Sequence, residues 1–253
     1  MSLNGNCMNT VAVAIICKTP AAGRSKTRLS PPLRPQDCAA LSACFIRDLS
    51  ETIRSLADDG DVTGYAVYTP QGSEAALRPL LPDCFELKLQ GEGDLGARLL
   101  KSATDLLHDG YAGVILVNSD SPTLPMAILR DAVNAVRRGD NVTLSPAFDG
   151  GYTLIGLSRP HARLFENLPW STSEVYRLTL DRALEIGLPV INVSGWYDVD
   201  DAASFQMLED ELAGRRPAFA APDLVGAKAP ATRKFLRKRQ SLRQNESVLA
   251  VHP

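Results

Sequence analysis

Short apolar runs alternate with longer amphipathic stretches along the first half of the chain, and this alternation constrains the fold most. Val11–Cys17 and Gly113–Val117 are apolar almost throughout, as expected of strands covered on both faces of a sheet. Between them Leu41, Phe45 and Leu49 recur at four-residue steps, which is typical of the buried face of a helix. Strands alternating with helices predict an α/β fold with a mostly parallel sheet and helices on both faces.

The same periodicities predict the remaining elements. The expected strands are residues 11–17, 62–68, 85–89, 113–117, 142–146, 152–157 and 189–193, and the expected helices are 35–57, 73–80, 94–108, 125–138, 171–187 and 201–212. Asp58-Asp-Gly60 is expected to end the first helix. Ser171 is expected to cap the helix over 171–187, with Glu174 completing a capping box.

The segment after the first expected strand, Lys18-Thr-Pro-Ala-Ala-Gly-Arg-Ser-Lys-Thr-Arg28, contains four cations and no acid. A cationic, glycine-bearing loop at the carboxyl end of the first strand of an α/β sheet is a frequent phosphate site. Backbone N–H groups near Gly23 can approach a phosphate closely, while Lys18, Arg24, Lys26 and Arg28 supply positive charge. We therefore expect this loop to bind phosphate groups; the alternative is a solvated surface loop.

Two acidic segments are candidates for a divalent metal. Asp120 directly follows the strand over 113–117, at the sheet edge where α/β proteins bind ligands, and an acid beside phosphates suits Mg²⁺ or Mn²⁺. The alternative for Asp120 is a helix N-cap. In Tyr197-Asp-Val-Asp-Asp201 one acid suffices to cap the next helix, so Asp198 or Asp200 is a candidate for a second metal ligand.

Phe148-Asp149-Gly150-Gly151-Tyr152 lies between two expected strands. Its simplest interpretation is a hairpin turn. Its functional interpretation is a glycine-lined wall for an acceptor substrate, formed by Gly150, Gly151 and Tyr152, with Asp149 as a polar contact or catalytic base. Trp170, followed by Ser-Thr172, is a candidate for the same acceptor pocket, although packing alone would also explain a tryptophan.

Gly91-Glu-Gly93-Asp94-Leu-Gly96 matches the glycine pattern of dinucleotide-binding loops. That pattern belongs to the first strand–helix turn of its unit, whereas this one follows the third strand. We therefore expect a turn over the ribose or base of a nucleotide, with Asp94 and Gly96 as its binding residues, rather than a nicotinamide or flavin site.

The bulk composition limits the partners and the compartment. The net charge of −2 gives no general attraction to nucleic acid or to a membrane. Five scattered cysteines without a Cys-x-x-Cys pair indicate reduced thiols and a cytoplasmic protein, and no apolar run is long enough to span a membrane.

The chain divides into a body over residues 9–213 and a tail over 214–253 that is Pro/Ala-rich and then basic. Residues 233–243 of that tail hold six cations and no acid, and without these six the chain has 21 basic against 29 acidic residues, a net charge of about −8. The tail either packs Phe235 and Leu236 on the body, is partly disordered, or faces RNA or a membrane.

Taken together, these motifs resemble small bacterial nucleotidyltransferases of the phospholactate and molybdenum-cofactor guanylyltransferase types. They are most similar to an uncharacterised bacterial family of the GT-A, or nucleotide-diphospho-sugar transferase, superfamily. The resemblance covers residues 10–212 and rests on Lys-x-Pro-x-x-Gly-x-x-Lys-Thr-Arg-Leu29, Gln90–Arg98, Asn118–Pro122, Asp149–Tyr152, Trp170–Thr172 and Asp198–Asp200. It implies a Rossmann-like, three-layer αβα fold.

The resemblance also implies roles for individual residues. A divalent metal would be held by Asp120, and since Asn118 stands where many glycosyltransferases have a first acid, Asp200 becomes its expected partner. Lys18, Lys26 and Arg28 match the pattern of the loop, whereas Arg24 stands at a variable position.

The sequence thus predicts a metal-dependent transferase that uses a nucleotide or nucleotide-sugar and a small-molecule acceptor. Glycosyl transfer from a nucleotide-diphospho-sugar is one expected reaction. Nucleotidyl transfer (guanylyl or cytidylyl) from a nucleoside triphosphate to a phosphorylated acceptor is the alternative. A regulatory module that binds nucleotides without turnover is a third, from a different class.

Overall fold

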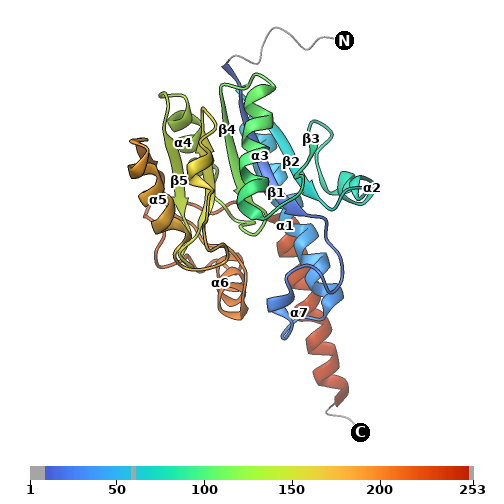
Figure 1. Ribbon diagram of the computed structural model, residues 1–253. Helices are drawn as coiled ribbons and strands as arrows, with labels where there is room; N and C mark the ends of the chain where they lie inside the picture. Colours follow the sequence, from blue (N-terminus) through green and yellow to red (C-terminus); the bar gives the residue numbers. More distant parts are fainter. Residues whose placement is uncertain (1–8, 58–60, 251–253) are drawn as a thin grey trace.

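A seven-stranded sheet forms the centre of the computed structural model, which describes residues 9–57 and 61–250, with side chains as far as residue 242 (Figure 1). The strands are β1 (Val11–Lys18), β2 (Val62–Thr69), β3 (Glu86–Leu89), β4 (Gly113–Asn118), β5 (Val142–Pro146), β6 (Tyr152–Leu157) and β7 (Val190–Asn192). They lie in the order β3-β2-β1-β4-β6-β5-β7, and β6 runs antiparallel to its neighbours β4 and β5 while the other pairs are parallel. The predicted mostly parallel sheet is confirmed.

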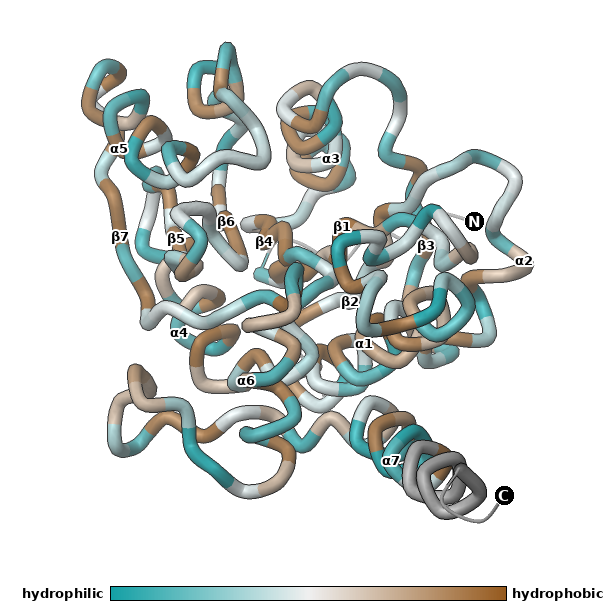
Figure 2. The backbone as a smooth tube through the Cα atoms, turned by 90° about the horizontal axis from the view of Figure 1, so that it is seen from below, coloured by the Kyte–Doolittle hydropathy of each residue, from teal (hydrophilic) through white to brown (hydrophobic). Residues whose placement is uncertain are grey.

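Helices cover both faces of this sheet, as Figure 2 shows. α3 (Leu95–His108) and α5 (Val175–Glu185) pack on one face, and α1 (Pro35–Ala57), α4 (Met126–Val136) and α6 (Ala202–Leu212) on the other. The short α2 (Glu74–Leu77) lies between β2 and β3 in the chain, and α7 (Pro230–Ala250) packs against α1. The result is the expected three-layer αβα fold.

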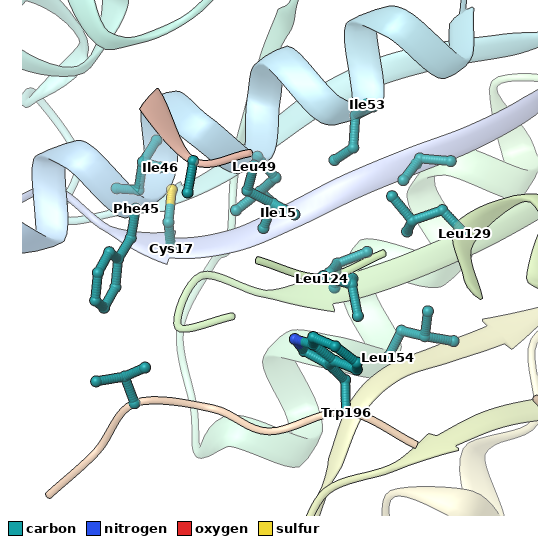
Figure 3. Close-up of a cluster of buried hydrophobic side chains, with 14 of the residues drawn as sticks. Ile15, Cys17, Phe45, Ile46, Leu49, Ile53, Leu124, Leu129, Leu154 and Trp196 are labelled. Atoms are coloured by element: carbon teal, nitrogen blue, oxygen red, sulfur yellow. The ribbon is translucent and has the colours of Figure 1, made fainter. Parts of the chain in front are cut away.

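Strand β1 shows why the sheet needs two helical layers. Val11, Val13 and Ile15 point into the core on the α1 side, while Ala12 and Ala14 point into the core on the α3 side. Because side chains alternate along a strand, a run that is apolar at every position must be covered on both faces. Figure 3 shows the α1 side, where Leu49 lies beside Ile15, with Phe45 and Ile53 of the same helix to either side.

The expected helix over 171–187 was wrong at its start. α5 begins at Val175, Ser171 has a left-handed backbone with φ of 65°, and Glu174 at the N-cap makes no side-chain capping bond. The cause is the β5–β6 turn. The backbone N–H of Tyr176 donates to the carbonyl of Gly150 at 2.9 Å, and a Cβ on Gly150 would lie 2.2 Å from the carbonyl oxygen of Ser173. This close backbone contact holds the segment before Val175 outside the helix.

Two further expectations from the sequence concern the end of the first helix and membrane-spanning segments. Asp58-Asp-Gly60, expected to end the first helix, lies outside the described residues. Every helix within residues 9–57 and 61–250 is too short or too polar to cross a bilayer.

The basic tail begins against the body. The carboxylate of Asp48 on α1 accepts hydrogen bonds from the backbone N–H groups of Ala231 at 2.8 Å and Thr232 at 2.7 Å, in the first turn of α7. These N–H groups have no partner within the helix, so Asp48 supplies one. Leu236 is buried in the α1-side core. Burial raises the pKa of Asp48, although its bonds to α7 oppose that rise.

We expect Asp48→Ala to lower the free energy of unfolding by about 1–3 kcal/mol, because the substitution leaves two N–H groups at the start of α7 without their acceptor. Urea unfolding of the full chain measures this change. The matched control is Glu51→Ala on the same helix, which removes only the solvent-exposed ion pair with Arg54 and should cost about 0.5 kcal/mol or less. Equal losses in the two variants would contradict the docking role of Asp48.

Candidate functional site

A cavity of about 490 Å³ opens at the carboxyl ends of β1 and β4 and beside the start of β6. Its walls come from the loop after β1, the loop after β4, the β5–β6 turn, the segment before α5 and the segment after β7. The predicted site residues that line it are Lys18, Lys26, Arg28, Asp120, Asp149, Gly151, Tyr152, Trp170 and Asp200. Predicted site residues that lie as far apart in the sequence as Lys18 and Asp200 therefore line one cavity.

Main-chain contacts bring the two predicted metal ligands together. The backbone N–H of Val199 donates to the carbonyl of Asp120 at 2.9 Å, which ties the segment after β7 to the loop after β4. The side-chain oxygen of Asn118 accepts from the backbone N–H of Asp120 at 3.1 Å, so Asn118 shapes this turn. Asp201 caps α6 through Ser204, which leaves Asp200 on the cavity side, as the surplus of acids predicted.

Lys26 joins these two acids. Its Nζ lies 2.8 Å from Oδ1 of Asp120 and 2.8 Å from Oδ1 of Asp200, and it also donates to the carbonyl of Val199 at 2.7 Å. The Lys26 side chain is 6% exposed. Burial lowers the pKa of its ammonium, but the carboxylates of Asp120 and Asp200 outweigh burial and raise the pKa overall. Lys26 thus contacts acids directly, and its predicted contact with phosphate stays a prediction.

A second acidic group overlaps the first. Asp149, Asp198 and Asp200 each offer a carboxylate oxygen, and these oxygens lie within 4.8 Å of one another. Burial, followed by the charges of Asp149, Asp200 and Asp120, raises the pKa of Asp198 to about 7. Oxygen donors at this spacing suit a hard divalent cation. The sequence placed Asp198 and Asp200 as alternatives for one role; the fold brings both to the cavity.

Three cations line the same cavity as the acids. Lys18, Arg24 and Arg28 are exposed and line the cavity. Arg24, set aside as a variable position, therefore lines the cavity together with the two cations that match the family pattern. The signal for it was present in the sequence, since it lies in the same acid-free loop.

Four predicted site residues do not line the cavity. Gly23 has φ of 74°, a left-handed value that favours glycine, and it serves the course of the loop. Asp94 caps α3 by accepting from the backbone N–H of Ala97 at 2.8 Å. A Cβ on Gly96 would lie 2.4 Å from the carbonyl oxygen of Phe165 and 2.9 Å from Nε1 of Trp170, so Gly96 permits close packing. Gly150 contacts the segment before α5, as described above.

The motif around Asp94 has a structural role that sequence reasoning missed. The side-chain amide of Gln90 donates to the carbonyls of Cys17 and Val67 at 2.9 and 3.0 Å, and its oxygen accepts from Arg98 at 2.9 Å. Gln90 thus joins the ends of β1 and β2 to the first turns of α3. In the structure this motif therefore holds together the junction between β3 and α3.

With this geometry established, comparisons with known proteins place the fold. Residues 52–172 match a family described as "Uncharacterized protein conserved in bacteria (DUF2064)". No curated protein matches the chain. The match agrees with the expected resemblance to an uncharacterised bacterial family.

Solved structures agree with the same fold. A protein from Desulfovibrio desulfuricans G20, provisionally described as a nucleotide-diphospho-sugar transferase, is 26% identical with a TM-score of 0.77, covering 92% of this chain and 97% of its own. CMP:2-keto-3-deoxy-manno-octonic acid synthetase complexed with CTP is 12% identical with a TM-score of 0.53, over 82% and 100% of the two chains. A cytidylyltransferase from Leptospira borgpetersenii is 12% identical with a TM-score of 0.51, over 94% and 96%. The predicted superfamily fold is confirmed.

We expect Lys26→Met to lower the free energy of unfolding by about 1–3 kcal/mol in a metal-free buffer, because it leaves Asp120 and Asp200 facing each other without a counter-ion. The value lies below that of a fully buried pair because the two carboxylate side chains are 32% and 41% exposed. The control is Lys101→Met, whose ion pair with Asp105 is on the surface and should change stability by about 0.5 kcal/mol or less. Urea unfolding in EDTA measures both, and a change no larger in Lys26→Met than in Lys101→Met would contradict the buried pairing.

Proposed function

We propose that this protein is a metal-dependent transferase that moves a group from a nucleotide substrate, of nucleotide-diphospho-sugar type, to a small-molecule acceptor. One observation carries the proposal: three exposed cations (Lys18, Arg24, Arg28) and four acids (Asp120, Asp149, Asp198, Asp200) line one cavity. The cations can bind phosphate groups, and the acids can hold a divalent cation that neutralises those phosphates. The fold shared with the Desulfovibrio desulfuricans protein supports the same class.

The acids fit a divalent metal. A cation, the ammonium of Lys26, already lies 2.8 Å from both Asp120 and Asp200, and the Asp198 carboxylate belongs to the same group as Asp200. We assign Mg²⁺ or Mn²⁺ to Asp120 and Asp200, since both metals take carboxylate oxygens. When bound, the metal supplies charge neutralisation for the diphosphate of the leaving nucleotide.

The residues of the chain perform the other parts of the reaction. Lys18, Arg24 and Arg28 hold the phosphate groups and keep them at the β1 end of the cavity. Asp149 is the base that accepts the proton of the acceptor hydroxyl. Its Oδ1 accepts from the backbone N–H of Gly151 at 2.8 Å, which holds the carboxylate in place on the β5–β6 turn. Gly151, Tyr152 and Trp170 form the wall against which the acceptor lies.

A second reaction, nucleotidyl transfer, is favoured by the number of cations on the loop. The cavity is lined by three exposed cations and by Lys26. This is more positive charge than a diphosphate needs, and it suits the β- and γ-phosphates of a nucleoside triphosphate. In that reaction an acceptor phosphate attacks the α-phosphate and pyrophosphate leaves. The two reactions therefore differ in their released product.

The test is mass spectrometry of reactions that contain a panel of nucleoside triphosphates and nucleotide-sugars with Mg²⁺ or Mn²⁺. Release of a nucleoside diphosphate supports the proposed reaction, and release of pyrophosphate supports the second. Asp149→Asn should lower turnover of the glycosyl reaction by about 10²–10⁴-fold, as expected for loss of a general base, and leave nucleotide binding within a fewfold of the parent. Loss of binding in Asp149→Asn would assign Asp149 to the metal site instead.

Nucleotide binding itself is tested by thermal shift, since a ligand of the folded state raises the apparent stability. Asp120→Asn and Asp200→Asn should abolish the metal-dependent part of the shift. Asp223→Asn, at an exposed position outside the cavity, is the control and should leave the shift unchanged. If Asp120→Asn keeps the full metal-dependent shift, the metal assignment is wrong.

We further expect Lys26→Met to bind Mn²⁺ about tenfold more tightly than the parent, which corresponds to about 1.4 kcal/mol. The ammonium and a divalent cation compete for the same oxygens of Asp120 and Asp200, and like charges cannot share that position at 2.8 Å. Electron paramagnetic resonance of free Mn²⁺, without nucleotide, gives the dissociation constants, and Lys18→Met serves as the control. Unchanged or weaker binding in Lys26→Met would show that Lys26 does not occupy the metal position.

A further inference from the structure

One part of the cavity is lined by hydrocarbon. Leu95 and Leu99 of α3 pack in one cluster with Ile16 of β1, Leu116 of β4 and Ile155 of β6, and Val175 at the start of α5 lines the same cavity. Leu116 and Ile155 are direct partners across the sheet. We call these six residues the aliphatic slot.

The aliphatic slot is continuous with the core between the sheet and α3. Leu99, Leu116 and Ile155 belong to that core, while Ile16 and Leu95 pack at its margin and are only partly buried. At this margin the core stops and the cavity begins. Water in contact with these side chains is unfavourable, so a non-polar ligand group that displaces it gains free energy.

The charges of the cavity decide which substrate uses the aliphatic slot. The phosphate groups of a nucleotide belong with Lys18, Arg24 and Arg28 on the loop after β1. A nucleobase carries polar edges, and hydrocarbon walls would leave those edges without hydrogen-bond partners, at a cost in binding. Alkyl or aryl groups carry no such cost.

The acceptor wall lies beside the aliphatic slot. Tyr152 and Trp170 line the same cavity and pack at the margin of the same core as Ile16 and Leu95. Asp149, the proposed base, stands three residues before Tyr152 on the β5–β6 turn. A molecule with a hydroxyl group near Asp149 and a non-polar body therefore finds suitable surroundings at both of its ends.

We propose that the acceptor is amphipathic, with a hydroxylated head directed to Asp149 and an alkyl or aryl body in the aliphatic slot. This inference rests on the proposed function and names the class of its acceptor.

The test uses isothermal titration calorimetry of the full chain with butyl, hexyl and octyl β-D-glucoside, each below its micelle concentration. These probes share one hydroxylated head and differ only in the alkyl chain. We expect affinity to rise about 3–4-fold for each added methylene until the slot is filled. Equal affinity across the three probes would overturn the proposal.

A pair of variants locates the binding. Leu95→Gln puts an amide at the slot and should reduce the gain from butyl to octyl by about tenfold or more, because the amide must lose water to admit the chain. Leu184→Gln changes a leucine that is 81% exposed on α5 and should leave the gain unchanged. Circular dichroism and urea unfolding check that Leu95→Gln is folded. A chain-length gain that is equal in the two variants would place the binding elsewhere on the surface and overturn the proposal.

A third measurement separates acceptor from nucleotide. The titration with octyl β-D-glucoside is repeated with a saturating amount of whichever nucleotide gives the largest thermal shift with Mg²⁺. Unchanged or tighter glucoside binding supports the proposal, and full competition would assign the slot to the nucleotide and overturn it. Failure of the nucleotide panel alone would refute the proposed function, whereas nucleotide binding without glucoside binding would refute only the acceptor class.

Discussion

A single ammonium group between two carboxylates joins parts of the cavity wall that lie far apart in the sequence. Lys26 comes from the loop after β1, Asp120 from the loop after β4, and Asp200 from the segment after β7. The Lys26 Nζ lies 2.8 Å from a carboxylate oxygen of each acid. Without a cation there, the acids of one cavity would repel each other in surroundings partly shielded from water. The buried position of Lys26 is thus a consequence of the acids that the proposed chemistry needs.

The sheet order makes this meeting possible. β1 and β4 are direct neighbours and run parallel, so their carboxyl ends, and the loops that follow them, lie at the same edge. The antiparallel β6 then brings its first residue, Tyr152, and the turn with Asp149 to that edge as well. Cations, acids, glycines and hydrocarbon reach one cavity, as the proposed transfer between a nucleotide and an acceptor requires.

Particular residues show why some site predictions need the structure. The place of Asp120 and Asp200 at the cavity could be predicted because an acid after a buried strand, and acids beyond what one cap requires, have few local explanations. Asp94 and Gly96 sat in an equally suggestive motif, yet Asp94 caps α3 and Gly96 permits the packing of Trp170. Ser171 matched the sequence pattern of a capping box, but the backbone of Gly150 packs closely against Ser173, and the helix begins only at Val175. For Gly96 and Ser171 the deciding contact comes from a residue distant in the sequence, whereas Asp94 caps its own helix through Ala97.

The sequence by itself determined the layers, the mostly parallel sheet and the loops that carry charge, because periodicity and strand-end position are local properties of the chain. Only the tertiary structure decided which charges meet. It paired Lys26 with the acids rather than leaving it among the exposed cations, brought Arg24 to the cavity, and joined Asp149 to Asp198 and Asp200. The physical reason is that electrostatic and packing partners depend on distance in space, which strand order and loop course set and which residue spacing does not record.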